Sequence, residues 1–233
     1  MTFGSLFSGV GGIDLGLELA GMRCRWQVEN DPFCLKVLEK HWPAVKRYGD
    51  IETLETNCLE NVDLIAGGFP CQDVSEAGPR HGIDEGTRSG LWIEFHRIVR
   101  DLRPKFVLVE NVTGLLSCGI GRVLGDLAEI GYDAEWSVVS ACSVGAPHTR
   151  ERVFVVAYPQ EQWGKQCRRI QQPEVGSKEG NVYFWTSQPE PQRVANGIPR
   201  RMDRLRCLGN AVAPQVAELI GRQIMLANLV GVR

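Results

Sequence analysis

The sequence predicts an α/β protein with a doubly wound, mostly parallel sheet. Two observations lead to this prediction: short apolar, strand-like runs alternate with amphipathic helical patterns, and polar residues or glycines follow several of those runs. Such alternation is typical of parallel sheets with helices on both faces. At 233 residues and 43% apolar content, the chain can bury one sizeable core.

The first half of the expected fold begins with a strand at residues 3–7. Glycines then turn the chain into an apolar helix from Ile13 to Ala20. Further strands are expected at 25–29 and 62–66, because both segments are of strand length and lead into polar or glycine residues. A short extended segment lies between them and precedes Asp50.

The second half alternates in the same way. Residues Leu91 to Leu102 show apolar residues at one-face spacing and end before Pro104, which predicts a helix. The periodic pattern is absent between Tyr158 and about Met202, where Pro, Gly, Gln and charged residues dominate. The remaining expected elements are strands near 106–110, 136–140 and 153–157 and helices from Ile120 to Ile130 and from Val216 to Ala227.

Two residues with reactive side chains follow buried strands. Cys71 lies in the step Pro70-Cys71-Gln72, shortly after the strand at 62–66, and Glu110 ends the strand at 106–110. The carboxyl ends of parallel strands meet at one edge of a sheet, where ligands bind. A thiol beside a carboxyl group there suits attack on an electron-poor ring with proton transfer. Taken singly, a cysteine after a strand is more often a small buried apolar residue, and Glu110 is also compatible with a solvated strand end.

A glycine turn and nearby acids predict a nucleoside-containing cofactor. The turn Gly9-Val10-Gly11-Gly12 lacks the GxGxxG spacing of nicotinamide-binding proteins, but it precedes a helix, where the backbone can approach a ligand closely. The acids in Glu29-Asn30-Asp31 and Asp50 follow the next two extended segments. Acids at these strand ends commonly bind ribose hydroxyls.

Five stretches together resemble the cytosine-C5 DNA methyltransferases, in particular compact bacterial or phage-type members. They occur in the family's order and cover about residues 1–157 and 203–227. The resemblance implies a Rossmann-like catalytic domain that uses S-adenosyl-L-methionine. The stretches are Leu6 to Gly12, Gly67 to Gln72, Glu110 to Val112, Gly145 to Arg152 and Leu208 to Val212.

The resemblance also implies roles for individual residues. Cys71 would attack C6 of a cytosine flipped out of the duplex, and Glu110 would act at N3. Arg150 and Arg152 would hold the flipped nucleotide, although His148 replaces the glutamine that is usual two residues earlier. The implied cofactor-binding residues are Phe7, Ser8, Gly9, Gly11, Gly12, Glu29, Asn30, Asp50, Ile51, Gly68, Pro70, Leu91, Asn210 and Ala211.

The charge distribution points to a DNA-contacting segment. Residues 165–206 hold nine Lys or Arg and four Asp or Glu, a balance of +5, while the rest of the chain carries −7. Basic residues interleaved with aromatic ones suit phosphate contact and base stacking. The expected DNA-binding residues are Gln72, Ser75, Arg80, Arg88, Arg168, Arg169, Arg193 and Arg200.

The expected organisation is a cofactor-binding catalytic domain at 1–158, a reduced target-recognition insertion at 159–202, and a C-terminal motif and helix at 203–233 that return to the catalytic domain. Eight cysteines without a CxxC pair, and the lack of a secretory signal or membrane-length apolar run, favour a cytoplasmic protein with reduced thiols and no metal site. We expect a monomer that acts on double-stranded DNA, and the resemblance leaves open a cognate restriction endonuclease encoded nearby.

Two other functions remain open at this stage. The first is a tRNA cytosine-C5 methyltransferase on the same fold; such relatives resemble Pro-Pro-Cys-Gln and carry a Cys-Phe-Thr motif, whereas this chain has Phe69-Pro70-Cys71-Gln72 and lacks the second motif. The second is a catalytically inactive DNA-binding relative. The short insertion favours it, and the intact Cys71, Glu110, Arg150 and Arg152 argue against it.

Overall fold

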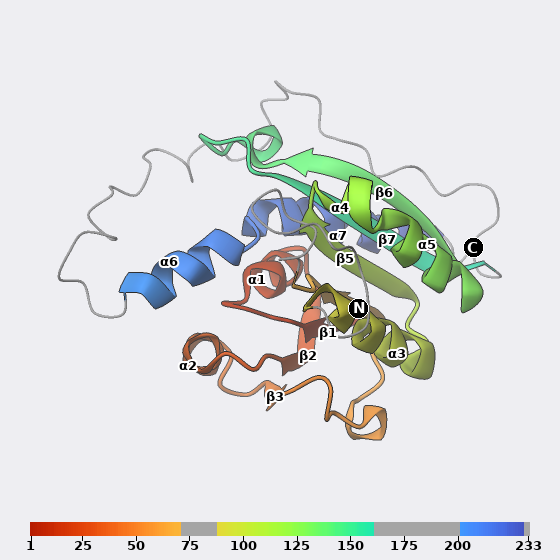
Figure 1. Ribbon diagram of the computed structural model, residues 1–233, viewed down its shortest axis with the longest axis horizontal. Helices are drawn as coiled ribbons and strands as arrows, with labels where there is room; N and C mark the ends of the chain where they lie inside the picture. Colours follow the sequence, from red (N-terminus) through yellow and green to blue (C-terminus); the bar gives the residue numbers. More distant parts are fainter. Residues whose placement is uncertain (71–87, 161–200, 231–233) are drawn as a thin grey trace.

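The computed structural model describes residues 1–70, 88–160 and 201–230. Within these residues, a seven-stranded sheet has the order β3-β2-β1-β4-β5-β7-β6 and is flanked by helices (Figure 1). The strands are β1 (Thr2–Leu6), β2 (Arg23–Val28), β3 (Lys46–Tyr48), β4 (Leu64–Gly67), β5 (Phe106–Val112), β6 (Tyr132–Ser140) and β7 (Glu151–Pro159).

The helices alternate with the strands along the chain, as the sequence predicts. None of those in the described ranges is long and apolar enough to span a membrane. They are α1 (Gly12–Leu19), α2 (Pro32–His41), α3 (Trp92–Leu102), α4 (Leu115–Cys118), α5 (Ile120–Glu129), α6 (Arg201–Asn210) and α7 (Pro214–Val230), with short 3₁₀ turns η1 (Thr56–Cys58), η2 (Arg88–Leu91) and η3 (Ala141–Val144).

The strand pairing confirms a doubly wound, mostly parallel sheet. β1 pairs in parallel with β2 on one side and with β4 on the other, and β4 pairs in parallel with β5. The chain therefore reverses its winding direction between β1 and β4, which is where open α/β sheets bind ligands. Only the far edge is antiparallel: β7 runs between β5 and β6 and pairs antiparallel with both.

Each sheet face carries its own apolar core. Alternate residues of β5 face opposite sides, so Val107 belongs to one buried cluster and Leu108 to the other. The first cluster includes Trp92 of α3, which is stacked on Phe95, together with residues of α5. The second cluster joins α1 and α7, where Ile220 is fully buried. Helices cover both faces of the sheet (Figure 1).

The six expected strands and four expected helices are present, with ends shifted by a few residues. The helices α2 and α6 were not expected from the apolar pattern. In α2 the buried side chains are Cys34 and Leu38, so its apolar stripe is narrow. Its start signal was nevertheless in the sequence: Pro32 opens the helix and the Asp31 carboxylate accepts hydrogen bonds from the backbone N–H groups of Phe33 and Cys34.

Candidate active site

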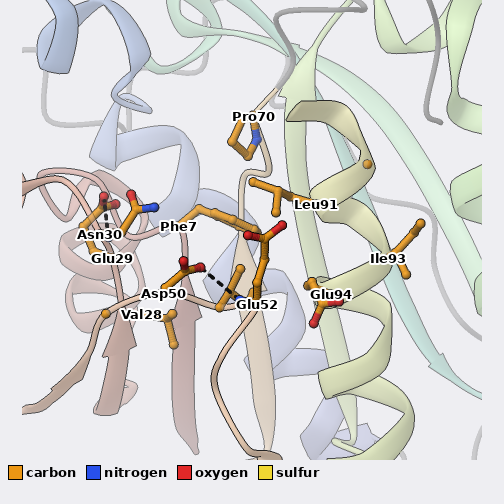
Figure 2. A pocket seen from close by; sticks show the side chains of 13 residues that line it. Phe7, Val28, Glu29, Asn30, Asp50, Glu52, Pro70, Leu91, Ile93 and Glu94 are labelled. Atoms are coloured by element: carbon orange, nitrogen blue, oxygen red, sulfur yellow. Dashed lines mark hydrogen bonds between the residues drawn. The ribbon is translucent and has the colours of Figure 1, made fainter. Parts of the chain in front are cut away.

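A cavity of about 550 Å³ lies at the carboxyl edge of the sheet, between the ends of β1, β2 and β3 and the start of α3. Figure 2 shows acidic side chains from the strand ends facing apolar and acidic side chains from η2 and α3. The lining residues are Phe7, Val28, Glu29, Asn30, Gly49, Asp50, Ile51, Glu52, Pro70, Gly90, Leu91, Ile93 and Glu94.

Seven of the expected cofactor residues line this cavity. They come from the segments after four strands, β1 to β4, and from η2, so the fold brings together side chains that are far apart in the chain. The seven are Phe7, Glu29, Asn30, Asp50, Ile51, Pro70 and Leu91.

The glycine turn after β1 lies next to this cavity, because Phe7 begins the turn and lines the cavity. Gly9 and Gly11 have positive φ values of 56° and 83°, which a glycine adopts without strain, whereas the φ of 53° at Phe7 is uncommon for a residue with a side chain. Gly11 is the N-cap of α1, and a Cβ on Gly12 would lie 2.6 Å from the backbone oxygen of Val212. The glycines therefore permit a tight turn and close packing on the C-terminal segment, and none of them lines the cavity.

Glu29 holds the turn against the end of β2. Its carboxylate accepts hydrogen bonds from the backbone N–H groups of Gly9 at 2.7 Å, Asn30 at 3.0 Å and Asp31 at 2.8 Å. Ser8 is buried, and its hydroxyl donates to Ser5 Oγ at 2.9 Å. Glu29 thus has a structural role in addition to facing the cavity.

Glu110 is the buried acid at the end of β5. Its Oε1 lies 3.1 Å from Arg152 Nε, and both side chains are largely shielded from solvent. Burial raises the pKa of Glu110 to about 7, although the nearby guanidinium groups of Arg152 and Arg150 act in the opposite direction. A carboxyl group with this pKa is protonated in a substantial fraction of molecules near neutral pH, so it can donate or accept a proton there.

The ends of β4 and β5 meet at this acid. Gly67 is in register with Val109, and a Cβ on Gly68 would lie only 2.4 Å from Glu110 Oε2. Asn111 Nδ2 also donates to the backbone oxygen of Phe69 at 3.3 Å. The segment that leads to Cys71 therefore packs directly against Glu110 and Asn111. A side chain at residue 68 would clash with the Glu110 carboxyl group.

The two arginines of β7 and its preceding turn have different partners. Arg152 pairs with Glu110, as described above. Arg150 has a positive φ of 24°, and its Nη2 donates to the backbone oxygens of Gly209 at 2.6 Å and Ala211 at 2.7 Å. Arg150 therefore connects the β6–β7 region to the C-terminal segment, a contact that the sequence pattern did not predict.

Some of the remaining expected residues lie in the described ranges but not in the cavity lining, and the others lie outside the described ranges. Gly68 contacts Glu110 rather than the cavity, and Asn210 and Ala211 lie at the end of α6 and directly after it, where they are not part of the cavity lining. Arg88 begins η2. The other residues lie outside the described ranges: Cys71, Gln72, Ser75, Arg80, Arg168, Arg169, Arg193 and Arg200.

Six residues that line the cavity were not expected from the sequence. Glu94 lies one helical turn beyond Leu91, so the helical period that places Leu91 at the cavity could also have identified Glu94. Glu52 follows Asp50 in a segment without regular periodicity, and no comparable signal marks it. The cavity residues that were not expected are Val28, Gly49, Glu52, Gly90, Ile93 and Glu94.

The sheet order, the cavity at its carboxyl edge and the buried acid at the end of β5 define a Rossmann-like α/β protein of the methyltransferase class. A sequence profile of the C-5 cytosine-specific DNA methylases matches residues 1–193. The chain belongs to this family.

Known relatives are type II methyltransferases. M2.BsuMI of Bacillus subtilis is 40% identical over 161 residues, which cover 66% of this chain and 41% of the relative. M.AquIA of Picosynechococcus sp. is 37% identical over 65% of this chain and 69% of its own length. M.Eco47II of Escherichia coli is 35% identical over 84% of this chain and 49% of its own length. The chain thus spans less than half of two of these three relatives.

Solved structures show the same fold. A DNA modification methyltransferase encoded within an E. coli prophage matches with a TM-score of 0.57 and 28% identity, over 69% of this chain and 47% of that one. DNMT2 of Spodoptera frugiperda matches with a TM-score of 0.60 over 73% of this chain and 53% of that one. At 21% identity, the second match supports the fold alone.

Proposed function

We propose that this protein transfers a methyl group from S-adenosyl-L-methionine to C5 of a cytosine in double-stranded DNA. The observation that carries the proposal is the buried Glu110–Arg152 pair at the end of β5, directly beside the segment that leads to Cys71. Family membership and the type II methyltransferase relatives support the same reaction.

The cavity is the proposed cofactor site. Its volume of about 550 Å³ suits a small-molecule ligand. Phe7, Ile51 and Leu91 supply apolar surface for an adenine ring, while Glu29 and Asp50 supply carboxylates for ribose hydroxyls and positively charged groups. The residues present therefore fit S-adenosyl-L-methionine, which when bound would supply an activated methyl group on its sulfonium.

Cys71 and Glu110 are the proposed catalytic pair. The Cys71 thiolate would form a bond to C6 of the flipped cytosine, while Glu110 gives a proton to N3, so that negative charge is available at C5 to take the methyl group. A base such as water would then take the C5 proton, which restores the C5–C6 double bond and releases Cys71 as a thiolate. N3 would return its proton to Glu110. The pKa of Glu110, raised by burial to about 7, supports proton donation at neutral pH.

The arginines have separate proposed roles. Arg152 would orient the Glu110 carboxyl group and, beside the pyrimidine O2, stabilise charge that develops on the ring. Arg150 would act on the C-terminal segment through Gly209 and Ala211. We propose that this contact holds the C-terminal segment in a position where Asn210 and Ala211 can bind the cofactor.

DNA recognition is assigned to the basic segment at 165–206 together with the loop that follows Cys71. Charge balance and aromatic content support the first, and the attached nucleophile supports the second. Because the relatives are type II methyltransferases, a cognate restriction endonuclease is the proposed partner enzyme.

Methyl transfer can be tested directly with plasmid DNA, bulk tRNA and S-adenosyl-L-methionine labelled on its methyl group. We expect the label to enter DNA alone, and bisulfite sequencing to find it at cytosines in one short target. Label in tRNA would assign the RNA substrate instead, and DNA binding without label in either would identify an inactive relative.

The covalent step can be tested with duplex DNA that carries 5-fluorocytosine at the target. The wild type should form a stable adduct, because fluorine at C5 cannot leave as a proton does. Cys71→Ser should form none, whereas Cys58→Ser, at an exposed cysteine of η1, which precedes β4, should react as the wild type does. Equal trapping by Cys71→Ser would reject the nucleophile assignment.

A further inference from the structure

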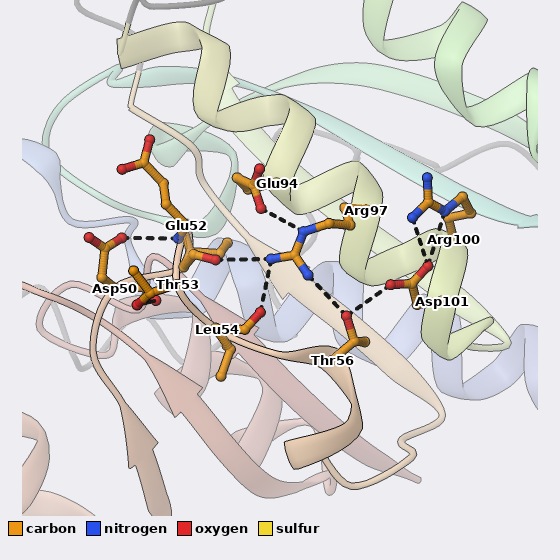
Figure 3. Close-up of polar contacts among 10 residues, drawn as sticks. Asp50, Glu52, Thr53, Leu54, Thr56, Glu94, Arg97, Arg100 and Asp101 are labelled. Atoms are coloured by element: carbon orange, nitrogen blue, oxygen red, sulfur yellow. Dashed lines mark hydrogen bonds and ion pairs between the residues drawn. The ribbon is translucent and has the colours of Figure 1, made fainter.

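Arg97 of α3 lies behind the cavity and is absent from its lining. Its guanidinium group nevertheless contacts the segment that carries Asp50, Ile51 and Glu52, which form one wall of that cavity (Figure 3). This segment connects β3 to β4 and, apart from the short turn η1, has no regular secondary structure. Something other than a strand ladder must therefore hold it in place.

All three nitrogens of the Arg97 guanidinium group are engaged. Nη2 donates to the backbone oxygens of Ile51 and Leu54, both at 3.0 Å, and Nη1 donates to Thr56 Oγ1 at 3.0 Å. Nε pairs with Glu94 Oε2 at 2.6 Å. The planar fork of an arginine holds several acceptors in one fixed geometry, which a lysine cannot do.

The contacts reach both walls of the cavity. Glu94 lines the cavity from α3 and also fixes the Arg97 side chain, while Ile51 lines it from the opposite segment and is held by the same side chain. Thr56 in turn donates to Asp101 Oδ2 at 2.9 Å, so the segment has a second connection to α3. Two walls that come from distant parts of the chain are thereby joined by one guanidinium group.

We propose that Arg97 is a positioning residue for the cofactor site: it sets the place of Asp50 and Ile51 relative to α3 and so determines affinity for S-adenosyl-L-methionine. The inference rests on the proposed function, since it takes the cavity as the cofactor site. It assigns Arg97 no contact with the cofactor or with DNA.

Calorimetry with S-adenosyl-L-methionine and with S-adenosylhomocysteine tests the proposal. Arg97→Ala and Arg97→Lys should each bind both compounds at least about 10-fold more weakly than the wild type. This loss is expected because Asp50 and Ile51 would shift relative to α3 by a fraction of an ångström. With saturating cofactor, kcat should stay within a few-fold of the wild type, so the loss appears in the KM for the cofactor. Arg222→Ala is the matched control, because Arg222 of α7 also pairs with a carboxylate, Glu218, and with a backbone oxygen, that of Leu19.

Hydrogen exchange of the backbone amides provides a readout that is independent of the cofactor. The amide of Leu54 donates to the backbone oxygen of Ile51. Its exchange rate should rise in both Arg97 variants and stay at the wild-type value in the Arg222→Ala control. Wild-type cofactor affinity in Arg97→Lys and Arg97→Ala, or a loss that appears equally in kcat, would overturn the proposal. If Arg97→Ala does not fold, Thr56→Val removes one of the contacts in a milder way and should show the same pattern.

The two proposals can fail separately. If the wild type binds no S-adenosyl-L-methionine, the cofactor assignment of the cavity fails, and with it the role of Arg97 in affinity, even where the exchange data show that Arg97 orders the segment. If the wild type binds and the Arg97 variants bind equally well, the proposed function stands and the positioning role is rejected.

Discussion

Glu110 combines burial with a close cation, and this combination determines its behaviour. An exposed glutamate would be ionised throughout the neutral range, whereas burial raises the pKa of Glu110 to about 7 despite the Arg152 guanidinium. The sequence could place this acid at a strand end, but its protonation depends on the packing around it.

Replacing Glu110 with Gln should lower the methylation rate by about 10²-fold to 10⁴-fold, because an amide cannot give a proton to the cytosine ring. The protonated form of Glu110 is lost as pH rises through its raised pKa. The descending limb of the wild-type pH profile should therefore lie near pH 7 and be absent in the variant. Single-turnover methyl transfer between pH 6 and 9 measures both, and calorimetry confirms that cofactor binding is retained. Identical profiles would remove Glu110 from the proton transfer.

Gly68 gives a second prediction at this scale. A Cβ at this position would lie 2.4 Å from Glu110 Oε2, so Gly68→Ala must displace the carboxyl group from Arg152. Methylation should fall by about 10²-fold, while S-adenosyl-L-methionine affinity should change little. Gly125→Ala in α5 is the control, because its Cβ meets nothing within 4 Å. Loss of cofactor binding in Gly68→Ala would instead place Gly68 in the cofactor site, as the sequence resemblance implies.

At the scale of elements, α2 and α6 meet through a pair of buried thiols. Cys34 Sγ and Cys207 Sγ are 3.4 Å apart, although 173 residues separate them in the chain. Asp31 completes a group of three side chains whose possible ligand atoms lie within 4.8 Å of one another. The Asp31 carboxylate is already paired with Arg206. Burial raises the pKa of both thiols, so we expect the pair to be oxidised slowly, and faster as the pH rises.

Prolonged treatment at alkaline pH with diamide, which takes up two hydrogen atoms, should convert these thiols to a disulfide and lower the protein mass by about 2 Da. The cross-link would close a long loop in the unfolded chain and should raise the unfolding free energy by about 2–4 kcal/mol. Peptide mapping under non-reducing conditions and urea unfolding measure the two effects. Cys207→Ser should abolish both, and Cys24→Ser should leave both unchanged, because the described contacts of Cys24 Sγ are Asp14 and the backbone oxygen of Trp26. A disulfide between other cysteines would contradict the prediction.

At the scale of the whole molecule, one continuous fold carries the proposed cofactor cavity and Glu110. The charge balance led us to propose that the basic segment at 165–206 contacts DNA. Replacing residues 165–200 with a Gly/Ser linker should abolish methylation at the specific target and leave S-adenosyl-L-methionine affinity intact. DNA binding by the wild type should also weaken steeply with salt, because phosphate contacts release counterions. Bisulfite sequencing measures methylation at the target, and calorimetry measures the affinity for S-adenosyl-L-methionine. Methylation of the same sites by the variant would assign recognition to the loop after Cys71.

The sequence by itself determined the order and type of most elements. Strand runs such as 106–110 and the helix before Pro104 are local patterns, because burial on one face repeats with the period of the element. The same patterns identified Glu110, Glu29 and Asp50 as strand-end acids, since the end of an apolar run can be read without knowledge of its neighbours.

The tertiary structure alone decided which of these residues meet. Arg150 and Arg152 look equivalent in the sequence, yet Arg150 binds backbone oxygens at the end of α6 and just after it, whereas Arg152 pairs with Glu110. Arg97 looks like an ordinary surface residue of an amphipathic helix, but it joins two walls of the cavity. Such contacts depend on the packing of segments that are distant in the chain, and local periodicity carries no information about that packing.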